Sequence, residues 1–233
     1  MDNAFYSCNE LRSLDLSNFD TKNVLSMKSI FQNCNSLTSL DISNFDTSKI
    51  TDFGSMFGEC YSLKSLDVSK FNTSNAVTMG MMFNNCSSLK SIDVSKFDTS
   101  KVTSISQMFE RCRSLEEINI GNFKTSNVEH IGGLFYECNS LKSIDISNLD
   151  FSKVFNIDNL FYGCSSLTSI DVSRIKYNNK ISINYLFAKC SSLKYIDISN
   201  FDSSKITSVS SLFDGCTSLT SVKLPNFGEK TIT

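Results

Sequence analysis

The sequence predicts an α/β repeat solenoid, an elongated stack of about nine coils that share one hydrophobic core. Three observations lead to this fold class. Every cysteine of the 233-residue chain stands 26 residues from the next one. A leucine follows each cysteine by three residues, and a phenylalanine precedes each cysteine from Cys34 onward by three residues. We number the coils by their cysteines, which are Cys8, Cys34, Cys60, Cys86, Cys112, Cys138, Cys164, Cys190 and Cys216.

The first half of each coil has the pattern of a strand, as coil two illustrates. Leu37, Leu40 and Ile42 form an LxxLxL pattern, in which apolar residues alternate with serine and aspartate. Alternation with a period of two is typical of a strand that buries one face. Phe45 continues toward the core, and residues 46–48 (Asp-Thr-Ser) have turn chemistry, because the aspartate can accept from the backbone two residues on. We therefore expect a parallel sheet along one side of the stack.

The second half of each coil has a longer apolar period. Ile50, Phe53, Met56 and Phe57 follow one another at i, i+3, i+6 and i+7. This spacing suits a short helix or 3-10 arc that faces the same core. The expected molecule has a parallel β-sheet on one face, short helical or 3-10 arcs on the other, and stacked apolar columns between them. One coil buries too little apolar surface to offset its chain entropy, so neighbouring coils must share their stability.

The unbroken period predicts a single solenoid domain over residues 1–233. Met1 is already in register with Met27 and Met79, so the chain begins inside a repeat, as a fragment of a longer array would. The cysteines should be buried free thiols, because like columns of parallel coils rarely present the geometry of a disulfide. A zinc site is not expected, since the chain has neither a CxxC pair nor a histidine partner for the cysteines.

Composition argues against several classes of function. The formal net charge is −2, from 22 Lys and Arg against 24 Asp and Glu, and no basic cluster suggests nucleic acid. No apolar run is long enough to span a membrane, and the N-terminus lacks the layout of a signal peptide. The motifs of catalysis and of phosphate or metal binding are missing, so neither an enzyme nor a cofactor is expected. His130, the one histidine, falls in a polar column and should lie on the surface.

The segment around the third cysteine shows a family resemblance. Residues 56–74 run Met-Phe-Gly-Glu-Cys-Tyr-Ser-Leu-Lys-Ser-Leu-Asp-Val-Ser-Lys-Phe-Asn-Thr-Ser. This unit resembles the BspA-like leucine-rich repeat, whose typical form is MFxxCxSLxSLDLSxFDTSxVxxM, and the resemblance covers essentially the whole chain. It implies a leucine-rich-repeat-like solenoid that is exposed on a bacterial cell surface or secreted. It also implies a role in adhesion, with a protein partner such as a host extracellular-matrix protein.

An acidic column runs along the predicted strand face. Carboxylates about 5 Å apart repel one another by about 0.8 kcal/mol in water, so something must offset the repulsion. Hydrogen bonds from neighbouring serines, with flanking lysines, are one explanation. A cation held between carboxylates, on a ladder from Asp15 through Asp41 and Asp67 to Asp93, is the other. Asn119 interrupts the column, whose members are Asp15, Asp41, Asp67, Asp93, Asp145, Asp171 and Asp197.

A second column alternates between asparagine and lysine, which suggests a true unit of two coils. Each lysine from Lys49 onward has an aspartate three residues before it, as Asp46 precedes Lys49, whereas the asparagine coils do not follow this rule. The alternation keeps the lysines about 10 Å apart, near the Debye length, and we expect each lysine to pair with the aspartate of its own turn. The column is Asn23, Lys49, Asn75, Lys101, Asn127, Lys153, Asn179 and Lys205.

The pattern breaks around coils six and seven. Aromatic side chains there replace small or polar residues at positions that the pattern makes exposed. Such residues are candidate contacts for a protein partner, together with the carboxylates of the same region. The alternative is local repacking, because Leu149 and Ile175 replace the larger phenylalanine of the Phe45 column. The candidates are Phe151, Phe155, Tyr177, Tyr185, Tyr195, Asp145, Asp171 and Asp197.

The sequence supports two functional hypotheses. The first is a non-catalytic protein-interaction scaffold, a cell-surface adhesion or host-protein-binding repeat domain whose strand face and aromatic break contact the partner. The second is a structural solenoid that associates end to end or binds cations along its aspartate ladder. A third idea, ice binding through the threonine column from Thr21 to Thr125, would need a regular array, which Phe151 and Tyr177 interrupt.

Overall fold

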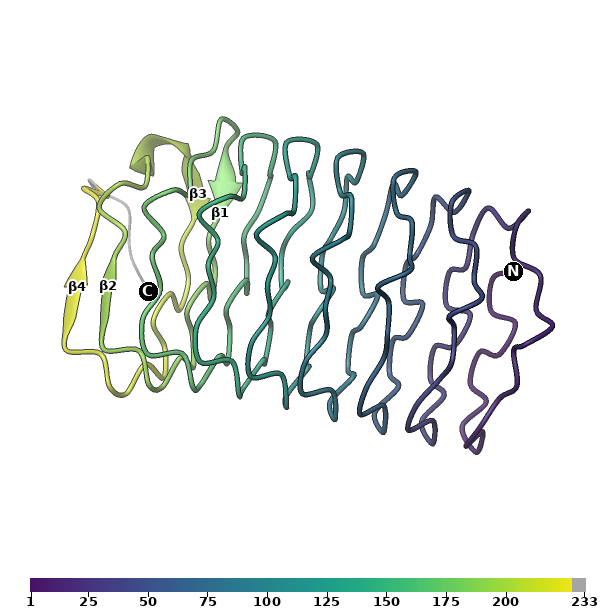
Figure 1. Cartoon of the computed structure of the whole chain (residues 1–233). Helices are drawn as coiled ribbons and strands as arrows, with labels where there is room; N and C mark the ends of the chain where they lie inside the picture. Colours follow the sequence, from purple (N-terminus) through teal and green to yellow (C-terminus); the bar gives the residue numbers. More distant parts are fainter. Residues whose placement is uncertain (228–233) are drawn as a thin grey trace.

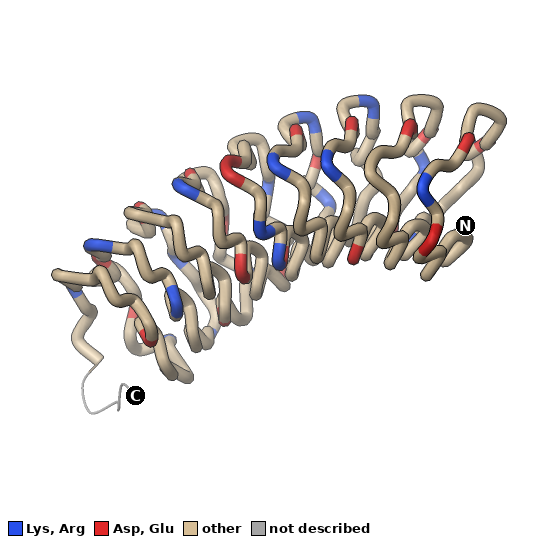
Figure 2. The backbone as a smooth tube through the Cα atoms, turned by 90° about the horizontal axis from the view of Figure 1, so that it is seen from below, with Lys and Arg blue, Asp and Glu red and all other residues tan. Residues whose placement is uncertain are grey.

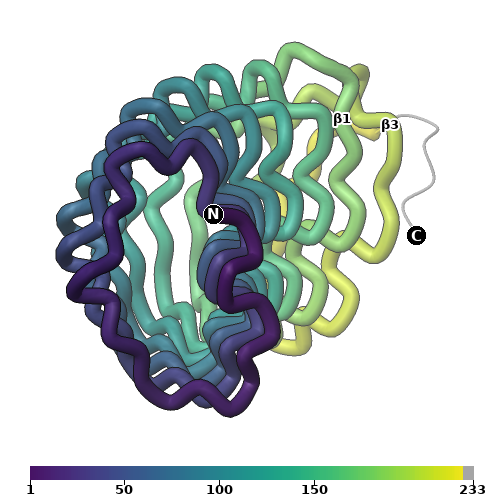
Figure 3. The backbone as a smooth tube through the Cα atoms, turned by 90° about the vertical axis from the view of Figure 1, so that its right-hand side faces the viewer, coloured from purple at the N-terminus to yellow at the C-terminus, as the bar shows by residue number. Residues whose placement is uncertain are grey.

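The computed structural model describes residues 1–227; the predicted domain over 1–233 also includes residues 228–233, which lie outside the described part. The described chain winds as a continuous stack of coils, with its first residues at one end and its last at the other (Figure 1). Seen end on, each coil runs around a common interior (Figure 3). The stack is bent along its length (Figure 2). The prediction of a repeat solenoid is therefore confirmed.

Regular secondary structure is confined to the last coils. The strand β1 (Ile181–Ser182) pairs in parallel with β3 (Ile206–Ser208), and β2 (Tyr195–Asp197) pairs in parallel with β4 (Ser221–Lys223). Among the described residues, the one helical element is the 3-10 helix η1 (Ser203–Lys205). The predicted helical arcs are thus not confirmed. The other coils wind through turns and isolated parallel bridges.

The side of the coil that was expected to be helical carries a hydrogen-bonded ladder instead. We call it the ladder face, and it comprises residues 25–33 and their equivalents in other coils. There the backbone N–H of Met27 donates to the carbonyl of Asp52 (3.0 Å), and that of Phe31 donates to Met56 (3.0 Å). Such bonds recur at every second residue, which is the pattern of a parallel sheet. The bridging residues are Ser26, Asp52, Thr78, Ser104, His130, Asn156 and Ser182.

Consecutive tight turns explain why the sequence of this face resembles that of a helix. The N–H of Cys34 returns to the carbonyl of Phe31 (3.2 Å) and closes a four-residue turn. Within this turn Asn33 has a φ of 64°, and Ser29 has a φ of 55° in the turn before it. A positive φ at the third residue is the requirement of a type II turn. A chain of such turns buries a side chain every three or four residues, as a helix also does.

The opposite side of the coil, residues 37–43 and their equivalents, is the leucine face. Its side chains alternate as predicted, with Leu37 and Ile42 buried and the serine and aspartate residues between them exposed. The continuous sheet expected here is present only as the β2–β4 pair. Elsewhere on this face, neighbouring coils share single backbone hydrogen bonds, such as that from the Lys64 N–H to the Thr38 carbonyl (3.1 Å). Because the ladder holds the coils at sheet spacing on one face only, the stack bends (Figure 2).

A column of phenylalanine rings fills the interior between the two faces. Successive rings stack with centroids 5.5–6.0 Å apart and interplanar angles of 3–11°. Each inner ring is covered by the rings of the layers before and after it, so its burial depends on both neighbours. The column is Phe5, Phe31, Phe57, Phe83, Phe109, Phe135, Phe161, Phe187 and Phe213.

The cysteine column is a row of free thiols, as the sequence predicts, and all of them except Cys8 and Cys216 are buried. Each thiol from Cys34 onward donates to the carbonyl of a phenylalanine one layer back in the stack, at 3.0–3.2 Å. Burial raises the pKa of Cys60 to about 12. The thiols are therefore uncharged packing groups that also join one layer to the next.

A buried threonine column joins the layers at the corner after the leucine face. The Thr47 hydroxyl donates to the carbonyl of Asn72 (3.0 Å) and accepts from the N–H of the same residue (2.8 Å). A buried column cannot present an ice-binding array, so that idea is wrong. Phe151 and Tyr177 occupy the same column and are only 1% and 4% exposed. The prediction that these two residues are exposed partner contacts is therefore also wrong.

The threonines of this column are buried as well, so the aromatic residues that replace them take buried positions. Leu149 and Ile175, two residues before them, are smaller than the phenylalanine that stands at their position in most coils. The Tyr177 ring packs edge-on against Phe201 of the next layer, with centroids 6.0 Å apart. Its hydroxyl donates to the carbonyl of Asp202 (3.2 Å) and so retains one of the two bonds that a threonine makes.

The alternation of asparagine and lysine is a contact between layers. Lys101 Nζ donates to Asn75 Oδ1 (2.8 Å), and the Asn75 amide donates to the carbonyl of Ser48 (2.8 Å). The same lysine–asparagine bond joins Lys49 to Asn23 and Lys153 to Asn127. Among the described lysines of this column, only Lys205 pairs with the aspartate of its own turn, Asp202 (3.5 Å). The predicted pairing within each turn is wrong, because an amide acceptor one layer back is the nearer partner.

Candidate functional site

The exposed aromatic candidates lie on two different faces. Phe155 and Tyr185 are on the ladder face, whereas Tyr195 is on the leucine face, and their exposed fractions are 51%, 39% and 42%. The Phe155 ring lies beside that of His130, with centroids 6.5 Å apart, and His130 is exposed as predicted. One compact partner contact cannot cover all three residues, so they belong to at least two candidate surfaces.

The aspartate column forms a series of turns on the leucine face. Asp41 Oδ1 accepts from the backbone N–H of Ser43 (2.9 Å), and hydrogen bonding from Ser43 lowers the pKa of Asp41. Asn119 keeps the same bond, to the N–H of Gly121 (2.9 Å). The expected hydrogen bonding from neighbouring serines is confirmed, and the cation ladder remains a prediction. Equivalent bonds are made by Asp15, Asp67, Asp93, Asp145, Asp171 and Asp197.

The leucine face is hollowed along its length, and we call this hollow the leucine groove. Ile92, Ile118 and Ile144, from three successive coils, line its middle stretch, with Asp93 and Glu117 among the polar residues beside them. The coils share few backbone hydrogen bonds on this face, which leaves space between them. Equivalent residues line the neighbouring stretches, namely Leu40 and Leu66 on one side and Ile170, Asp171 and Tyr195 on the other.

Two rows of opposite charge border the leucine groove. The aspartate column is one row, and a basic column stands three residues before it, about 10 Å away along an extended chain. Coil five breaks this order, because Glu116 takes the basic position and the neutral Asn119 takes the acidic one. Thr38 and Thr168 leave the basic position uncharged in coils two and seven. Lys142 Nζ lies 2.6 Å from Glu116 Oε2. The exposed basic residues are Arg12, Lys64, Lys90, Lys142 and Lys194; Figure 2 shows charged residues recurring from coil to coil.

Tyr195 is tied into the acidic row where the leucine groove ends. Its hydroxyl donates to Asp197 Oδ2 (3.1 Å), and Lys223 Nζ lies 3.2 Å from the same oxygen. Hydrogen bonds from Ser199, with those from Lys223 and Tyr195, hold the pKa of Asp197 well below its ordinary value. This carboxylate therefore stays ionised, and it orients an exposed aromatic ring beside the groove.

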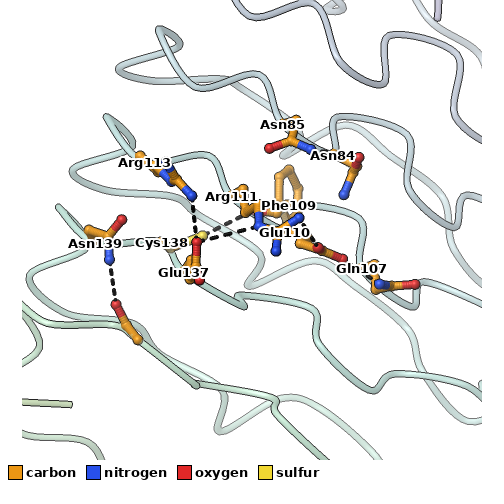
Figure 4. Close-up of polar contacts among 11 residues, drawn as sticks. Asn84, Asn85, Gln107, Phe109, Glu110, Arg111, Arg113, Glu137, Cys138 and Asn139 are labelled. Carbon is orange, nitrogen blue, oxygen red and sulfur yellow. Dashed lines mark hydrogen bonds and ion pairs between the residues drawn. The ribbon is translucent and has the colours of Figure 1, made fainter. Parts of the chain in front are cut away.

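A charged network lies on the ladder face around coils four and five (Figure 4). Glu110 is 7% exposed and is the one buried carboxylate among the described residues. The Gln107 amide donates to Glu110, and Arg111 Nη1 lies 3.3 Å from Glu110 Oε1. Arg111 and Arg113 both reach Glu137 Oε2, at 3.4 and 2.6 Å. Burial raises the pKa of Glu110, and a perturbed carboxylate of this kind marks a candidate site.

A tyrosine stack extends the network along the ladder face. The rings of Tyr136 and Tyr162 stack with centroids 4.6 Å apart and an interplanar angle of 4°. The Arg111 guanidinium lies 5.4 Å from the centre of the Tyr136 ring, and Lys189 Nζ lies 5.2 Å from that of Tyr162. Tyr185 meets Tyr162 edge-on at 6.5 Å. Cations therefore flank the stack at both ends, in the arrangement that favours cation–π attraction.

A family model matches the chain in three overlapping segments, residues 1–92, 66–169 and 134–227. The family is described as "Mycoplasma protein of unknown function, DUF285". The chain belongs to the DUF285 family. No curated protein matches this DUF285 chain.

Three solved structures are similar to the DUF285 chain, and all three are leucine-rich repeat proteins. The leucine-rich repeat protein TpLRR of T. pallidum is 22% identical, with 73% of this chain and 72% of that one covered and a TM-score of 0.49. A leucine-rich repeat protein from Bacteroides ovatus is 24% identical, with 86% of this chain and 64% of that one covered and a TM-score of 0.30. A leucine rich cell surface protein from Faecalibacterium prausnitzii is 20% identical, with 95% of this chain and 62% of that one covered and a TM-score of 0.35.

Sequence reasoning missed the basic row and the charged network of this DUF285 chain. The repeat spacing could have predicted the network, because Tyr136 and Tyr162 are 26 residues apart and so share a column. Charged residues are also concentrated around Cys112. Among residues 1–227, no group of three or more His, Cys, Asp or Glu side chains is placed to hold a metal ion. Within the same residues, no helix has the length and apolar character needed to cross a membrane.

Proposed function

We propose that this DUF285 chain is a non-catalytic protein-interaction scaffold of a bacterial cell surface, and that the leucine groove binds its protein partner. The observation that carries the proposal is an apolar groove floor between two exposed rows of opposite charge. An extended or helical protein segment presents the complementary arrangement, with apolar side chains toward the groove and charged ones at its edges. The exposed charges orient the partner, and each adds a modest share of the affinity.

The two charge rows favour one orientation of a segment that lies along the groove. Basic side chains of the partner meet the aspartate row, and its acidic side chains meet the basic row. A segment turned the other way brings like charges together, which disfavours it. Glu116 and Glu117 of coil five place acidic side chains at the basic row, so they also favour one register along the groove.

Placement on the cell surface, and a host extracellular-matrix protein as the partner, rest on the resemblance to the BspA-like repeats. The groove supports a protein partner more generally, because its floor is apolar over several coils and its walls offer serine hydroxyl groups. Tyr195 adds an exposed ring held beside Asp197, which is the kind of anchor that dominates many protein interfaces.

The test measures binding of the purified chain to a panel of purified host extracellular-matrix proteins by biolayer interferometry. The double variant Lys90→Glu, Lys142→Glu reverses part of the basic row, and Lys101→Glu, Lys153→Glu is its control, with the same change of net charge at the corner column. We expect the groove variant to lose about tenfold in affinity and the control to lose little. Equal losses would place the contact outside the groove, and no binding to any member would remove this partner class.

The exposed aromatic residues separate the two faces in the same assay. Tyr195→Ala should weaken binding at the leucine groove, whereas Phe155→Ala, on the ladder face, should not. A loss with Phe155→Ala alone would move the protein-binding surface to the ladder face.

End-to-end association is the second candidate function. Phe5 and Leu11 in the first layer, and Phe213 and Leu219 in the last complete one, are only half-buried, since each is covered from one side. Sedimentation velocity over a wide concentration range tests this candidate. Growth of the sedimentation coefficient with concentration supports it, and an unchanging monomer rules it out.

A further inference from the structure

We propose that the ladder face carries a second binding site, for a neutral oligosaccharide, which is separate from the protein-binding groove. The site is a depression over Gly132 and Gly133. Gln107 borders it from the layer before, and Asn156 and Asn159 border it from the layer after. Glu110 and Arg111 of the charged network, and Tyr136 of the tyrosine stack, also line the depression.

Two adjacent glycines form the floor of the depression, and the Asn156 and Gln107 side chains lie directly over them. A Cβ atom on Gly132 would lie 2.6 Å from Asn156 Oδ1, and one on Gly133 would lie 3.1 Å from Gln107 Cγ. Gly133 also has a φ of 65°, where a side chain is strained. The other complete coils carry a side chain at one or both of these two positions. Coil five is therefore the place on the ladder face where amide side chains of both neighbouring layers lie directly over glycine backbone.

The two asparagines at the rim have side-chain amides that make no hydrogen bond within the described chain. Both residues are half-buried. Asparagines elsewhere commonly donate to the carbonyl of a neighbouring layer, as Asn127 does to Ser100 (2.8 Å). Asn156 and Asn159 instead keep a donor and an acceptor available beside the hollow. An amide with both groups available can bond two adjacent hydroxyl groups of a sugar ring.

The charged groups around the hollow already have partners within the protein. Glu110 is paired with Arg111 (3.3 Å) and accepts from the Gln107 amide, which leaves the Gln107 carbonyl oxygen as an acceptor. Asp158 accepts from the Ser182 hydroxyl (2.8 Å) and so forms part of the wall. An ionic ligand would have to compete with these contacts. The remaining groups are neutral donors and acceptors, which suits a ligand rich in hydroxyl groups.

Tyr185 supplies an aromatic platform one layer beyond Asn159. Its ring is 39% exposed and meets Tyr162 edge-on, which holds it in place. Exposed aromatic rings pack against the apolar C–H face of a pyranose, and the ring hydroxyl adds a polar contact. The layers are about 4.8 Å apart, and one unit of a linear pyranose chain advances by a similar distance. A sugar chain along the ladder face can therefore place successive units over Gly133, Asn159 and Tyr185.

Titration of the ¹⁵N-labelled chain with cellohexaose and with chitohexaose tests the proposal by NMR. We expect saturable shifts with one or both sugars, with a dissociation constant of about 1 mM, confined to residues around the hollow and Tyr185. Removing both amides with Asn156→Ala, Asn159→Ala should weaken binding about tenfold, and Tyr185→Ala should weaken it to a similar extent.

The controls separate ligand contacts from structural effects. Ser55 stands in the same column as Asn159 and also has a positive φ, 53° against 59°, so Ser55→Ala reproduces the backbone strain away from the hollow. Tyr61→Ala removes another exposed tyrosine. Both should bind sugar like the parent chain, and so should the Lys90→Glu, Lys142→Glu groove variant.

Three results would overturn the proposal. One is no saturable shift with either sugar. Another is full binding by the folded asparagine double variant, with folding checked by its melting temperature. The third is an equal loss in Ser55→Ala. If the asparagine variant does not fold, Tyr185→Ala decides, because an exposed ring is dispensable for the core and full binding by that variant contradicts the site. Loss of protein binding with retention of sugar binding separates this site from the groove.

Discussion

The thiol of Cys86 donates a hydrogen bond to the carbonyl oxygen of Phe57, 3.1 Å away and one layer back in the stack. The same oxygen also accepts from the backbone N–H of Cys60 (3.3 Å), which closes a turn in its own layer. A carbonyl oxygen has two lone pairs, so one serves the turn and the other serves the contact between layers. Cysteine suits this position because it is a small apolar group that is still a weak donor.

Replacing a buried cysteine should cost more than replacing the half-buried one at the start of the column. Cys86→Ala removes the layer contact and leaves a small cavity, so we expect a loss of about 1–2 kcal/mol in the free energy of unfolding. Cys8→Ala is the matched control, because its half-buried thiol makes no such bond among the described residues. Urea denaturation measures both, and equal losses would show that the layer contact adds nothing.

The thiols should be unreactive in the folded chain and should make it sensitive to alkali. Burial raises the pKa of Cys60 from its ordinary value of 9.0 to about 12. A raised folded pKa means that the unfolded chain loses its thiol protons first, so stability is full below about pH 9 and falls as the pH rises toward 12. Melting temperatures measured from pH 7 to 10.5 should show this decline. Rapid modification of most thiols by a disulfide reagent at pH 7.5, without unfolding, would contradict the buried column.

The threonine column should carry more stability than its exposed counterparts. Thr73→Val preserves shape but removes the donor to the Asp98 carbonyl (3.1 Å) and the acceptor of the Asp98 N–H (2.8 Å). Because a backbone N–H then loses its partner, we expect a loss of about 2–3 kcal/mol. Thr51→Val removes one bond of an exposed hydroxyl and should cost much less. Chemical denaturation compares the two, and a Thr73→Val variant as stable as the parent would show that the column only fills space.

The aspartate column should act through its turns and should not depend on metal ions. Asp67→Asn keeps an acceptor for the Ser69 N–H, as Asn119 does naturally, and should leave the melting temperature unchanged, whereas Asp67→Ala should lower it. Neither calcium nor a chelator should shift the melting temperature of the parent chain. A rise with calcium that a chelator abolishes would support the cation ladder instead.

Glu110 should make stability depend on pH in the opposite sense to the aspartates. Its pKa is raised by burial, so the folded state disfavours the ionised form, and this cost appears as the pH rises above the unfolded pKa. Glu110→Gln removes the titration while keeping an acceptor for Gln107. The melting temperature of the variant relative to the parent should therefore be higher at pH 8 than at pH 4. A difference that does not change with pH would mean that Arg111 compensates the buried charge fully.

The register of the repeat predicts which residues share a column, but not which face carries the hydrogen bonds. Leu37 and Ile42 alternate with exposed residues as a strand does, and they are buried as predicted. The backbone ladder nevertheless forms on the other face, because the turns around Ser29 and Asn33 direct alternate N–H groups along the stack. A spacing of three residues is common to such turns and to a helix, so side-chain periodicity alone could not separate them.

For the candidate sites as well, the repeat position of a residue could be predicted from the sequence, but its surroundings in the stack could not. The exposed positions of Tyr185 and Tyr195 could be predicted from their columns. Tyr177 could not, because the threonine that it replaces makes its hydrogen bonds inside the stack and not toward solvent. The burial of Glu110 could not be predicted from the sequence either, because it depends on the layers on either side and on Arg111.

Amide hydrogen exchange measured by NMR on the native chain tests most directly where the layers are joined. The N–H groups of Met79, Met81 and Phe83 bond to the next layer on the ladder face, at 2.9–3.0 Å. The N–H groups of residues 91–93, on the leucine face of the next coil, have no backbone acceptor in the described chain. We predict protection of the first set by about a thousandfold or more over the second. Strong protection of residues 91–93, with rapid exchange at the three ladder residues, would place the sheet on the leucine face and contradict the ladder.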